Sequence, residues 1–157
     1  MLDELLQQLT DALKARGWML ATAESCTGGW IAKVCTDLAG SSGWFERGFV
    51  TYSNEAKQDM LGVKTATLAQ HGAVSEAVTA EMAVGALQHS RAQVAVSVSG
   101  IAGPGGATLT KPVGTVCFGW AVKDGAVRTE TCHFEGDREA VRQQSVEHAL
   151  RGVLHLL

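Results

Sequence analysis

A short stretch near the N-terminus, ATAESCTGGW at residues 21–30, places Ser25, Cys26 and Thr27 between an apolar run and two glycines. A serine in the first turn of a helix can simply cap that helix by accepting a hydrogen bond from a backbone N–H. It can also attack a carbonyl carbon, because the backbone amides after it and the positive end of the helix would stabilise the resulting oxyanion. The stretch taken alone leaves both interpretations open.

A nucleophilic serine needs a base, and the sequence offers a lysine rather than a histidine. AESCTGG does not match the G-x-S-x-G pattern of common serine hydrolases, and the five histidines are dispersed along the chain. Lys57 lies one turn into an expected helix, where burial and the positive helix end would both lower its pKa. Tyr52, the only tyrosine, could relay a proton or orient Lys57. The alternative for both residues is a solvated lysine and a tyrosine whose hydroxyl lies in water.

Two neighbours of Ser25 also have two interpretations each. Cys26 is a rival nucleophile, because a helix N-terminus favours a thiolate, although a small buried cysteine is the more frequent case. Glu24 either anchors a substrate or is a solvated acid at the end of a strand. Neither choice can be made from these residues alone.

A second glycine-rich turn follows the valine-rich run AQVAVSVS at residues 92–99. The glycines of GIAGPGGATLTKPVG free backbone amides to approach an anion, so the segment is either a phosphate cradle or an ordinary wide loop. It fits neither the P-loop nor the dinucleotide pattern, because no helix follows it. Ligands of open α/β sheets bind beyond the carboxyl ends of parallel strands. The two turns would therefore share one pocket if their strands run parallel.

Hydrophobic spacing predicts the elements that must position these residues. Leucines at helical spacing predict an amphipathic helix from Leu2 that ends near Gly17. The further elements expected along the chain are a strand over 18–23, a helix over 27–39, a strand over 45–52, a helix from 53 or 54 through 61, a helix from 75 to about 89, a strand over 92–99, two strands joined by a two-residue turn at Asp124-Gly125, and a final helix from about 137. This order predicts an α/β fold: a three-layer α/β/α single domain over residues 1–157 with a mixed sheet and a C-terminal hairpin plus helix.

Composition excludes several classes of function. The 157 residues carry a net charge of −3 without a basic cluster, so nucleic-acid binding is not expected. No apolar stretch approaches ~20 residues and no signal peptide is recognised, so we expect a cytoplasmic protein without membrane contact. The four cysteines have no C-x-x-C spacing, which predicts reduced thiols rather than disulfides. Metal-ligand spacings such as H-E-x-x-H are also missing, so neither a metal nor a cofactor is expected.

Four ordered motifs extend over nearly the whole chain: ESCTGG, GFVTYSNEAKQDMLGV, HGAVSEAV, and SVSGIAGPGG with KPVGTV. Together they closely resemble the family of the C-terminal domain of competence/damage-inducible protein CinA. Single-domain members of that family are nicotinamide-nucleotide amidases, which hydrolyse the carboxamide of nicotinamide mononucleotide to nicotinate mononucleotide and ammonia without a metal. The resemblance implies a nucleophile at Ser25 with partners Tyr52 and Lys57, a small-molecule nucleotide as substrate, and a homodimer.

Candidate substrate contacts come partly from the resemblance and partly from glycine content. Backbone amides near the phosphate or ribose are expected in the stretch from Ser99 to Gly106, and Asn54 and Arg142 are added as further candidates. The full set of expected substrate-binding residues is Glu24, Cys26, Thr27, Gly28, Asn54, Ser99, Gly100, Gly103, Gly105, Gly106 and Arg142. The loop departs from the family pattern after Gly106, where a further glycine is expected, and this departure could alter substrate fit. The N-terminal domain of two-domain members has no counterpart here, so its pyrophosphatase chemistry is not expected.

The resulting hypothesis is a serine amidase. Ser25, deprotonated by a neutral Lys57 with help from Tyr52, attacks the amide carbon, and amides near Cys26 and Thr27 stabilise the oxyanion before water hydrolyses the acyl-enzyme. Three alternatives remain at this point. They are a non-catalytic nucleotide-binding module, a thiol enzyme that uses Cys26, and an amidase for another small phosphorylated amide.

Overall fold

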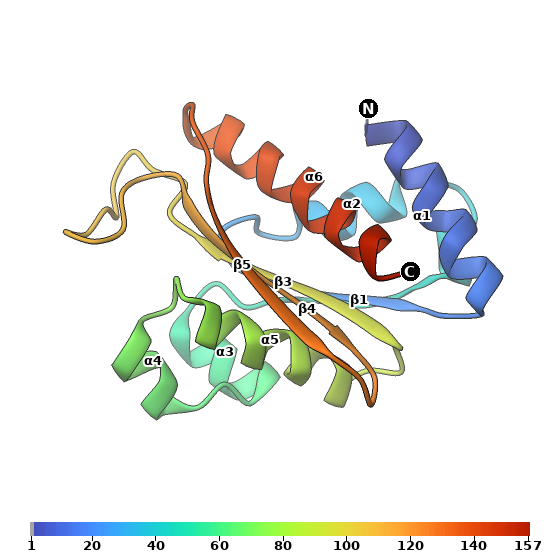
Figure 1. The fold of residues 1–157 in the computed structure, drawn as a ribbon, viewed down its shortest axis with the longest axis horizontal. Coiled ribbons are helices and arrows are strands. Elements are labelled where there is room, and N and C mark those ends of the chain that lie inside the picture. The colour runs from blue at the N-terminus through green and yellow to red at the C-terminus, as the bar shows by residue number, and fades with distance from the viewer. Residues whose placement is uncertain (1) are drawn as a thin grey trace.

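The computed structural model describes residues 2–157, in which helices cover both faces of a central sheet (Figure 1). The sheet has five strands in the order β2-β1-β3-β4-β5 within this range. Its strands are β1 (Leu20–Glu24), β2 (Phe45–Val50), β3 (Val94–Gly100), β4 (Thr115–Val122) and β5 (Val127–His133). The first three strands run parallel, and β4 and β5 form an antiparallel hairpin. The predicted α/β fold, a three-layer domain with a mixed sheet and a C-terminal hairpin plus helix, is confirmed.

The helices divide into two sets, one for each face of the sheet (Figure 1). One set is α1 (Leu2–Arg16), α2 (Trp30–Thr36) and α6 (Arg138–Leu156), and the other is α3 (Asn54–Leu61), α4 (Thr65–His71) and α5 (Glu76–Gln88). Each set packs on its own buried hydrophobic cluster against the sheet. None of the helices within residues 2–157 is both long and apolar enough to cross a membrane.

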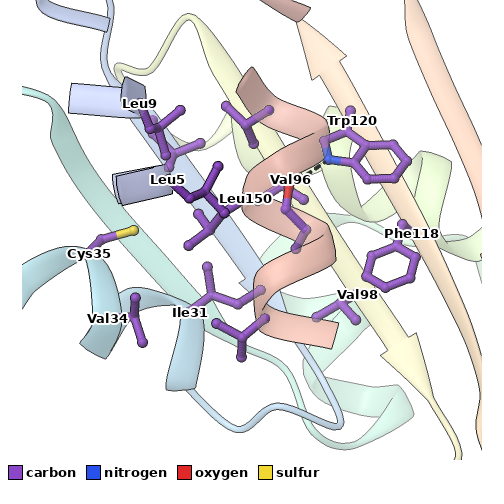
Figure 2. Packing of buried hydrophobic residues seen from close by; sticks show 14 of the residues in the cluster. Leu5, Leu9, Ile31, Val34, Cys35, Val96, Val98, Phe118, Trp120 and Leu150 are labelled. Carbon is purple, nitrogen blue, oxygen red and sulfur yellow. Dashed lines mark hydrogen bonds between the residues drawn. The ribbon is translucent and has the colours of Figure 1, made fainter. Parts of the chain in front are cut away.

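Close packing fixes α6 against the sheet, as Figure 2 shows for the core around Leu150. Trp120 of β4 is buried, and its Nε1 donates a hydrogen bond of 3.0 Å to the carbonyl of Ala149. A Cβ at Gly152 would lie 2.2 Å from the Trp120 ring, so a glycine is needed for the helix to approach this closely. Anchoring at this point also holds the N-terminal part of α6, which carries two arginines of interest below.

The register of β1 and β3 brings the two glycine-rich turns to one edge of the sheet. The strands are parallel, with Glu24 opposite Val98. Ser25, the first residue after β1, extends the pairing by donating its N–H to the Val98 carbonyl at 3.1 Å. The condition under which both turns would share one pocket is therefore met.

The helix after Ser25 begins later than predicted. α2 covers Trp30–Thr36, whereas hydrophobic spacing predicted a helix over 27–39. Gly28 and Gly29 have φ values of 59° and 100°, in the left-handed region, so the right-handed helix cannot begin until they have been passed. The expectation that a helix starts directly after Ser25 and Cys26 is wrong. Ser25 lies instead on a turn that precedes the helix.

Two further local expectations also differ from the structure. The two-residue turn predicted at Asp124-Gly125 is wrong, because Val122 pairs with Ala126 and leaves a three-residue loop between them. The Lys123 N–H donates to the Gln93 carbonyl at 2.8 Å, so it pairs with the segment that precedes β3 and not with the other strand of the hairpin. The short helix α4 was not predicted from sequence. These differences do not alter the order of the main elements.

Candidate active site

A cavity of about 260 Å³ lies where β1 and β3 end, and residues from both turns line it. Seven of the predicted site residues are among its lining: Ser25, Cys26, Tyr52, Asn54, Lys57, Ser99 and Gly100. Three lining residues, Ala73, Val74 and Arg138, were not predicted, and a fourth, Ala102, lies within the predicted stretch from Ser99 to Gly106. The fold therefore gathers side chains from the first 57 residues and from the second half of the chain at one place.

The central contact of this cavity joins Lys57 and Ser25. Lys57 Nζ lies 3.0 Å from Ser25 Oγ, and it also lies 2.9 Å from the carbonyl oxygen of Thr51 and 3.4 Å from that of Tyr52. Lys57 is in the first half of α3, whose start is fixed by Ser53 accepting the Ala56 N–H at 3.0 Å. This cap sets the direction in which the lysine side chain leaves the helix.

Lys57 is buried without a counter-ion. Only 1% of its surface is exposed, and within residues 2–157 no carboxylate forms an ion pair with it. Burial lowers the pKa of Lys57 below its usual range, while the nearby Cys26 acts in the opposite direction. A neutral amine has two N–H bonds and one lone pair. In the neutral form, donation of the two N–H groups to the Thr51 and Tyr52 carbonyls would leave the lone pair for the proton of Ser25.

Glu24 is buried beneath the turn and does not line the cavity. One of its carboxylate oxygens accepts the Thr27 hydroxyl at 2.6 Å and the Ile31 N–H at 2.9 Å, and the other accepts the Ala32 N–H at 3.0 Å. With 1% of its surface exposed, the solvated alternative for Glu24 is wrong. Its carboxylate takes the place of an N-cap for α2, where Gly29 has no side chain to offer. Glu24 therefore ties the serine turn to the helix that follows.

Arg142 of α6 holds the same turn from the other side. Its Nε donates to the Cys26 carbonyl at 3.0 Å and its Nη2 to the Thr27 carbonyl at 3.1 Å, while the guanidinium lies over the Trp30 ring. With Thr27 and Gly28, Arg142 lines a separate shallow hollow of about 460 Å³. These residues therefore support the turn next to the cavity and do not contribute to its lining.

The backbone amides of Cys26 and Thr27 are left over by these contacts. The Gly28 N–H donates to the Ser25 carbonyl at 3.1 Å, the Trp30 N–H donates to the Thr27 carbonyl at 3.0 Å, and the next two amides of α2 donate to Glu24. Within residues 2–157, no carbonyl or side-chain oxygen accepts a hydrogen bond from the amides of Cys26 and Thr27. No protein oxygen occupies either amide, although the Cys26 N–H lies close to its own thiol sulfur, so both can bind an oxygen atom that enters the turn.

The Cys26 thiol is in a setting that keeps it protonated. Burial raises its pKa to about 11, and the Cys26 backbone amide, Arg142 and Lys57 lower it too little to compensate. At neutral pH the thiolate is therefore a very small fraction of the population. This setting counts against the alternative in which Cys26 is the nucleophile.

Tyr52 lines the cavity from an exposed position. Its side chain is 66% exposed, and its contact with Lys57 is made by the backbone carbonyl. Within the described residues, no hydrogen bond to the Tyr52 hydroxyl is formed. A proton relay through this hydroxyl stays a prediction.

The long loop between β3 and β4 contributes its first residues to the cavity and then leaves it. Ser99 and Gly100 line the cavity, while Gly103, Gly105 and Gly106 do not. Beyond them the loop extends away from the body of the molecule (Figure 1). Near its tip the Leu109 side chain is fully exposed.

Arg138 was missed because nothing near it in the sequence marks it as a site residue. It is the first residue of α6, and its Nη1 donates to the Gly103 carbonyl at 2.8 Å across 35 residues of chain. Ala73 and Val74 did carry a signal, because they belong to the HGAVSEAV motif, although no site role was assigned to that motif. The contact of Arg138 with the loop places a guanidinium cation in the cavity lining with Lys57.

Comparisons with known proteins agree with one another. The CinA C-terminal domain family model matches residues 2–157. The nicotinamide-nucleotide amidohydrolase PncC of Escherichia coli K12 is 62% identical, covering 96% of this chain and 91% of that protein. The protein of the same name from Enterobacter agglomerans is 60% identical, covering 98% of this chain and 93% of that protein. The crystal structure of competence/damage inducible protein CihA from Agrobacterium tumefaciens superimposes with a TM-score of 0.96 at 46% identity, covering 99% of this chain and 94% of that one.

Proposed function

This chain belongs to the CinA C-terminal domain family, and we propose that it hydrolyses the carboxamide of nicotinamide mononucleotide to nicotinate mononucleotide and ammonia. Two amidohydrolases named for this class of substrate match nearly its whole length at 60% identity or more. The observation that carries the proposal is the 3.0 Å contact between Lys57 Nζ and Ser25 Oγ. This contact pairs a nucleophile with a base. Because burial lowers the pKa of Lys57, the lysine is neutral at a lower pH than a lysine in water.

In the first step Ser25 attacks the carboxamide carbon. Its hydroxyl proton passes to the lone pair of Lys57, and the carbonyl oxygen becomes an oxyanion. The free amides of Cys26 and Thr27 are the donors next to this point, and one such donor is worth about 3 kcal/mol in other enzymes. Glu24 and Arg142 hold the turn that carries both amides, so the donors are in place before the substrate arrives.

In the second step the amide nitrogen leaves. The Lys57 ammonium returns its proton to that nitrogen, so ammonia departs and an ester is left on Ser25. A water molecule then gives a proton to Lys57 and attacks the ester. The Lys57 ammonium returns that proton to the Ser25 oxygen as the acid is released, which regenerates both groups. Each proton transfer has a protein group to serve it, and we therefore expect the reaction to run without a metal.

The mononucleotide phosphate needs a cation and backbone amides at the rim of the cavity. Arg138 supplies the cation, and its contact with the Gly103 carbonyl holds it beside the glycine-rich loop. Guanidinium–phosphate pairs are strong and directional, since several N–H groups face the oxygens together. We assign the orientation of the substrate to the pairing of Arg138 with the phosphate, and the chemical steps to Ser25 and Lys57.

The test is ammonia release from nicotinamide mononucleotide by the purified protein in the presence of a chelator. We expect turnover by the wild type, a loss of at least about 10³-fold in Ser25→Ala, and near-normal turnover in Cys26→Ala, because only the first removes the nucleophile. Nucleotide binding is measured in parallel by calorimetry. Wild-type turnover in Ser25→Ala would overturn the mechanism. Binding without ammonia release by the wild type would identify a nucleotide-binding module instead.

The predicted homodimer stays a proposal. Sedimentation or light scattering of the purified protein over a range of concentrations decides between one chain and two.

A further inference from the structure

A second group of chemically active side chains lies away from the cavity, between the edge strand β5 and helix α6. It consists of Glu130 and Cys132 on β5 and His148 on α6. Cys132 Sγ lies 3.5 Å from Glu130 Oε1 and 3.5 Å from His148 Nε2, and Glu130 Oε1 is in contact with His148 Nε2. One sulfur, one nitrogen and one oxygen therefore converge on a single point. None of the three residues lines the active-site cavity.

The two separations from the sulfur match the edges of a tetrahedral zinc site. Glu130 Oε1 and His148 Nε2 are in direct hydrogen-bond contact, closer than such an edge, and would move apart to admit the ion. With Zn–S near 2.3 Å and Zn–N or Zn–O near 2.0–2.2 Å, a tetrahedron places its sulfur roughly 3.5 Å from the nitrogen and the oxygen. Both distances from Cys132 Sγ have this value. Thiolate, imidazole and carboxylate are also the three ligand types that zinc uses in proteins. The set favours zinc over magnesium or calcium, which prefer oxygen ligands.

The fold holds these three side chains in place from both elements. Glu130 and Cys132 are two residues apart on β5 and so face the same side of the sheet, toward α6. Thr129 and Thr131 face the other side, where their hydroxyls donate to Glu76 of α5 at 2.6 and 2.7 Å. These two hydrogen bonds fix which side chains of β5 face α5 and which face α6, and they do so without any contact to Glu130, Cys132 or His148.

The His148 ring is held by aromatic neighbours. Its centroid lies 4.8 Å from that of Phe118 and 6.0 Å from those of Trp120 and Phe134. A ligand held in this way loses little rotamer freedom when it binds an ion.

Local charge permits a divalent cation. A thiolate, a carboxylate and a neutral imidazole together carry two negative charges, which balance one zinc ion. Arg128 and Arg151 line the same hollow, and Arg128 acts electrostatically on Glu130, but the Arg128 guanidinium lies over the Trp120 ring and Arg151 pairs with Glu147 at 2.7 Å. A hollow of about 220 Å³ beside Glu130 and His148 leaves room for water as a fourth ligand.

We propose that Glu130, Cys132 and His148 form a zinc-binding site that links β5 to α6 and stabilises the fold without taking part in the amidase reaction. Binding converts the Cys132 thiol to a thiolate and releases its proton to solvent, as for other cysteine–zinc sites. The three residues are spread over 19 positions of the chain, so they do not form a short metal-ligand motif that the sequence analysis could detect.

The experiment uses the untagged full-length protein, stripped with a chelator and then titrated with Zn²⁺ and with Co²⁺. We expect about one zinc ion per chain by native mass spectrometry. At a free zinc concentration near 100 times Kd, the melting temperature should rise by roughly 5 to 10 °C. The Co²⁺ form should show the near-ultraviolet absorption of a thiolate-to-cobalt charge transfer, which only a cysteine ligand produces.

Two conservative variants and one control locate the site. Cys132→Ser should abolish the charge-transfer band and the thermal shift, and Glu130→Gln should weaken zinc binding at least about tenfold. His133→Gln is the matched control, because His133 is a histidine of the same strand on the opposite face, and it should bind as the wild type does. The proposal is overturned if the wild type shows no thermal shift and no charge-transfer band. It is equally overturned if Cys132→Ser, shown to be folded by circular dichroism, binds zinc as tightly as the wild type.

Discussion

Two glycine-containing turns leave neighbouring parallel strands at the same edge of the sheet, yet they are held very differently. The turn over residues 24–30 has its carboxylate, Glu24, saturated by three donors, and Arg142 binds two of its carbonyls. The loop over residues 101–114 has three side-chain hydrogen bonds that connect it to other parts of the described chain. Two join Arg138 to the Gly103 carbonyl and Lys111 to the His71 carbonyl, and the third joins the adjacent Thr115 hydroxyl to the Pro112 carbonyl.

The difference separates chemistry from access. Attack on a carbonyl requires the nucleophile and the oxyanion donors to be fixed to within a fraction of an ångström, and the Glu24 and Arg142 contacts provide this. Admission and release of a nucleotide require a wall that can adjust, and the loop with its exposed Leu109 has few contacts to break. The comparison predicts that substitutions in the first turn affect kcat, while those in the loop affect KM or nothing.

The largest effect is expected at the base. Lys57→Met should lower kcat by about 10² to 10⁴-fold, because it removes the proton acceptor. The fold should not suffer, since a buried lysine with a lowered pKa opposes folding at neutral pH and methionine removes that burden. Turnover and the melting temperature are measured together, with Lys33→Met on the exposed face of α2 as control. A melting temperature well below that of the wild type would show that the loss of activity reflects unfolding.

The next effect is expected at the support of the turn. Glu24→Gln keeps the shape but replaces one accepting oxygen by an NH₂ group, so one of the buried donors around it loses its partner. We expect a loss of about 1–3 kcal/mol in the free energy of unfolding and a fall of roughly 10- to 100-fold in kcat as the turn loosens. Denaturant titration and steady-state kinetics measure the two quantities. Glu55→Gln, at an exposed acid in α3, serves as the matched control. Equal behaviour of the two variants would show that Glu24 does not support the catalytic turn.

The pH dependence should show the lysine directly. The neutral amine is the active form, so kcat/KM should fall roughly tenfold for each pH unit below the Lys57 pKa. Because burial lowers that pKa, the midpoint of this limb should lie below the value of about 10.4 for a free lysine. The sign for stability is the same: the unfolded chain holds the proton more tightly, so stability rises with pH between the folded and unfolded pKa values. A limb centred at the free-lysine value would mean that Lys57 is not the base.

The smallest effects are expected in the loop and its contact. Arg138→Gln should raise KM about tenfold with little change in kcat, since a charged hydrogen bond to the substrate near the rim is worth about 1.5 kcal/mol, the low end of the usual range. Leu109→Ser at the exposed tip should leave both constants unchanged within error, as for most surface positions. Steady-state kinetics on the two variants side by side compares the root and the tip of the loop. A drop in kcat for Leu109→Ser would contradict the prediction that substitutions in the loop leave kcat unchanged.

The parts of the site that depend on local sequence could be predicted. Capping at Ser53 and helical spacing place Lys57 one turn into α3, and the valine-rich run places Ser99 at the end of a buried strand. Parallel strands then bring both segments to the edge where Ser25 lies. These predictions need only the chain within a few residues of each position.

Contacts between distant parts of the chain could not be predicted. Arg142 lies 116 residues from the carbonyl of Cys26 that it binds, and no periodicity encodes such a pair. The late start of α2 has a similar origin, because a buried carboxylate, Glu24, caps the helix from seven and eight residues upstream. Spacing reports which face of a helix is apolar, but it does not report which buried side chain will satisfy the first amides.

The two hydrogen bonds from Arg142 also order the events of biosynthesis. Nucleophile and base are both present once the ribosome has added residue 57, but the guanidinium that binds the serine turn is added only at residue 142 of 157. A nascent or prematurely terminated chain that lacks α6 therefore carries Ser25 and Lys57 without the clamp on their turn. The catalytic turn therefore reaches its final form only after the N-terminal part of α6 has been synthesised and has packed against it.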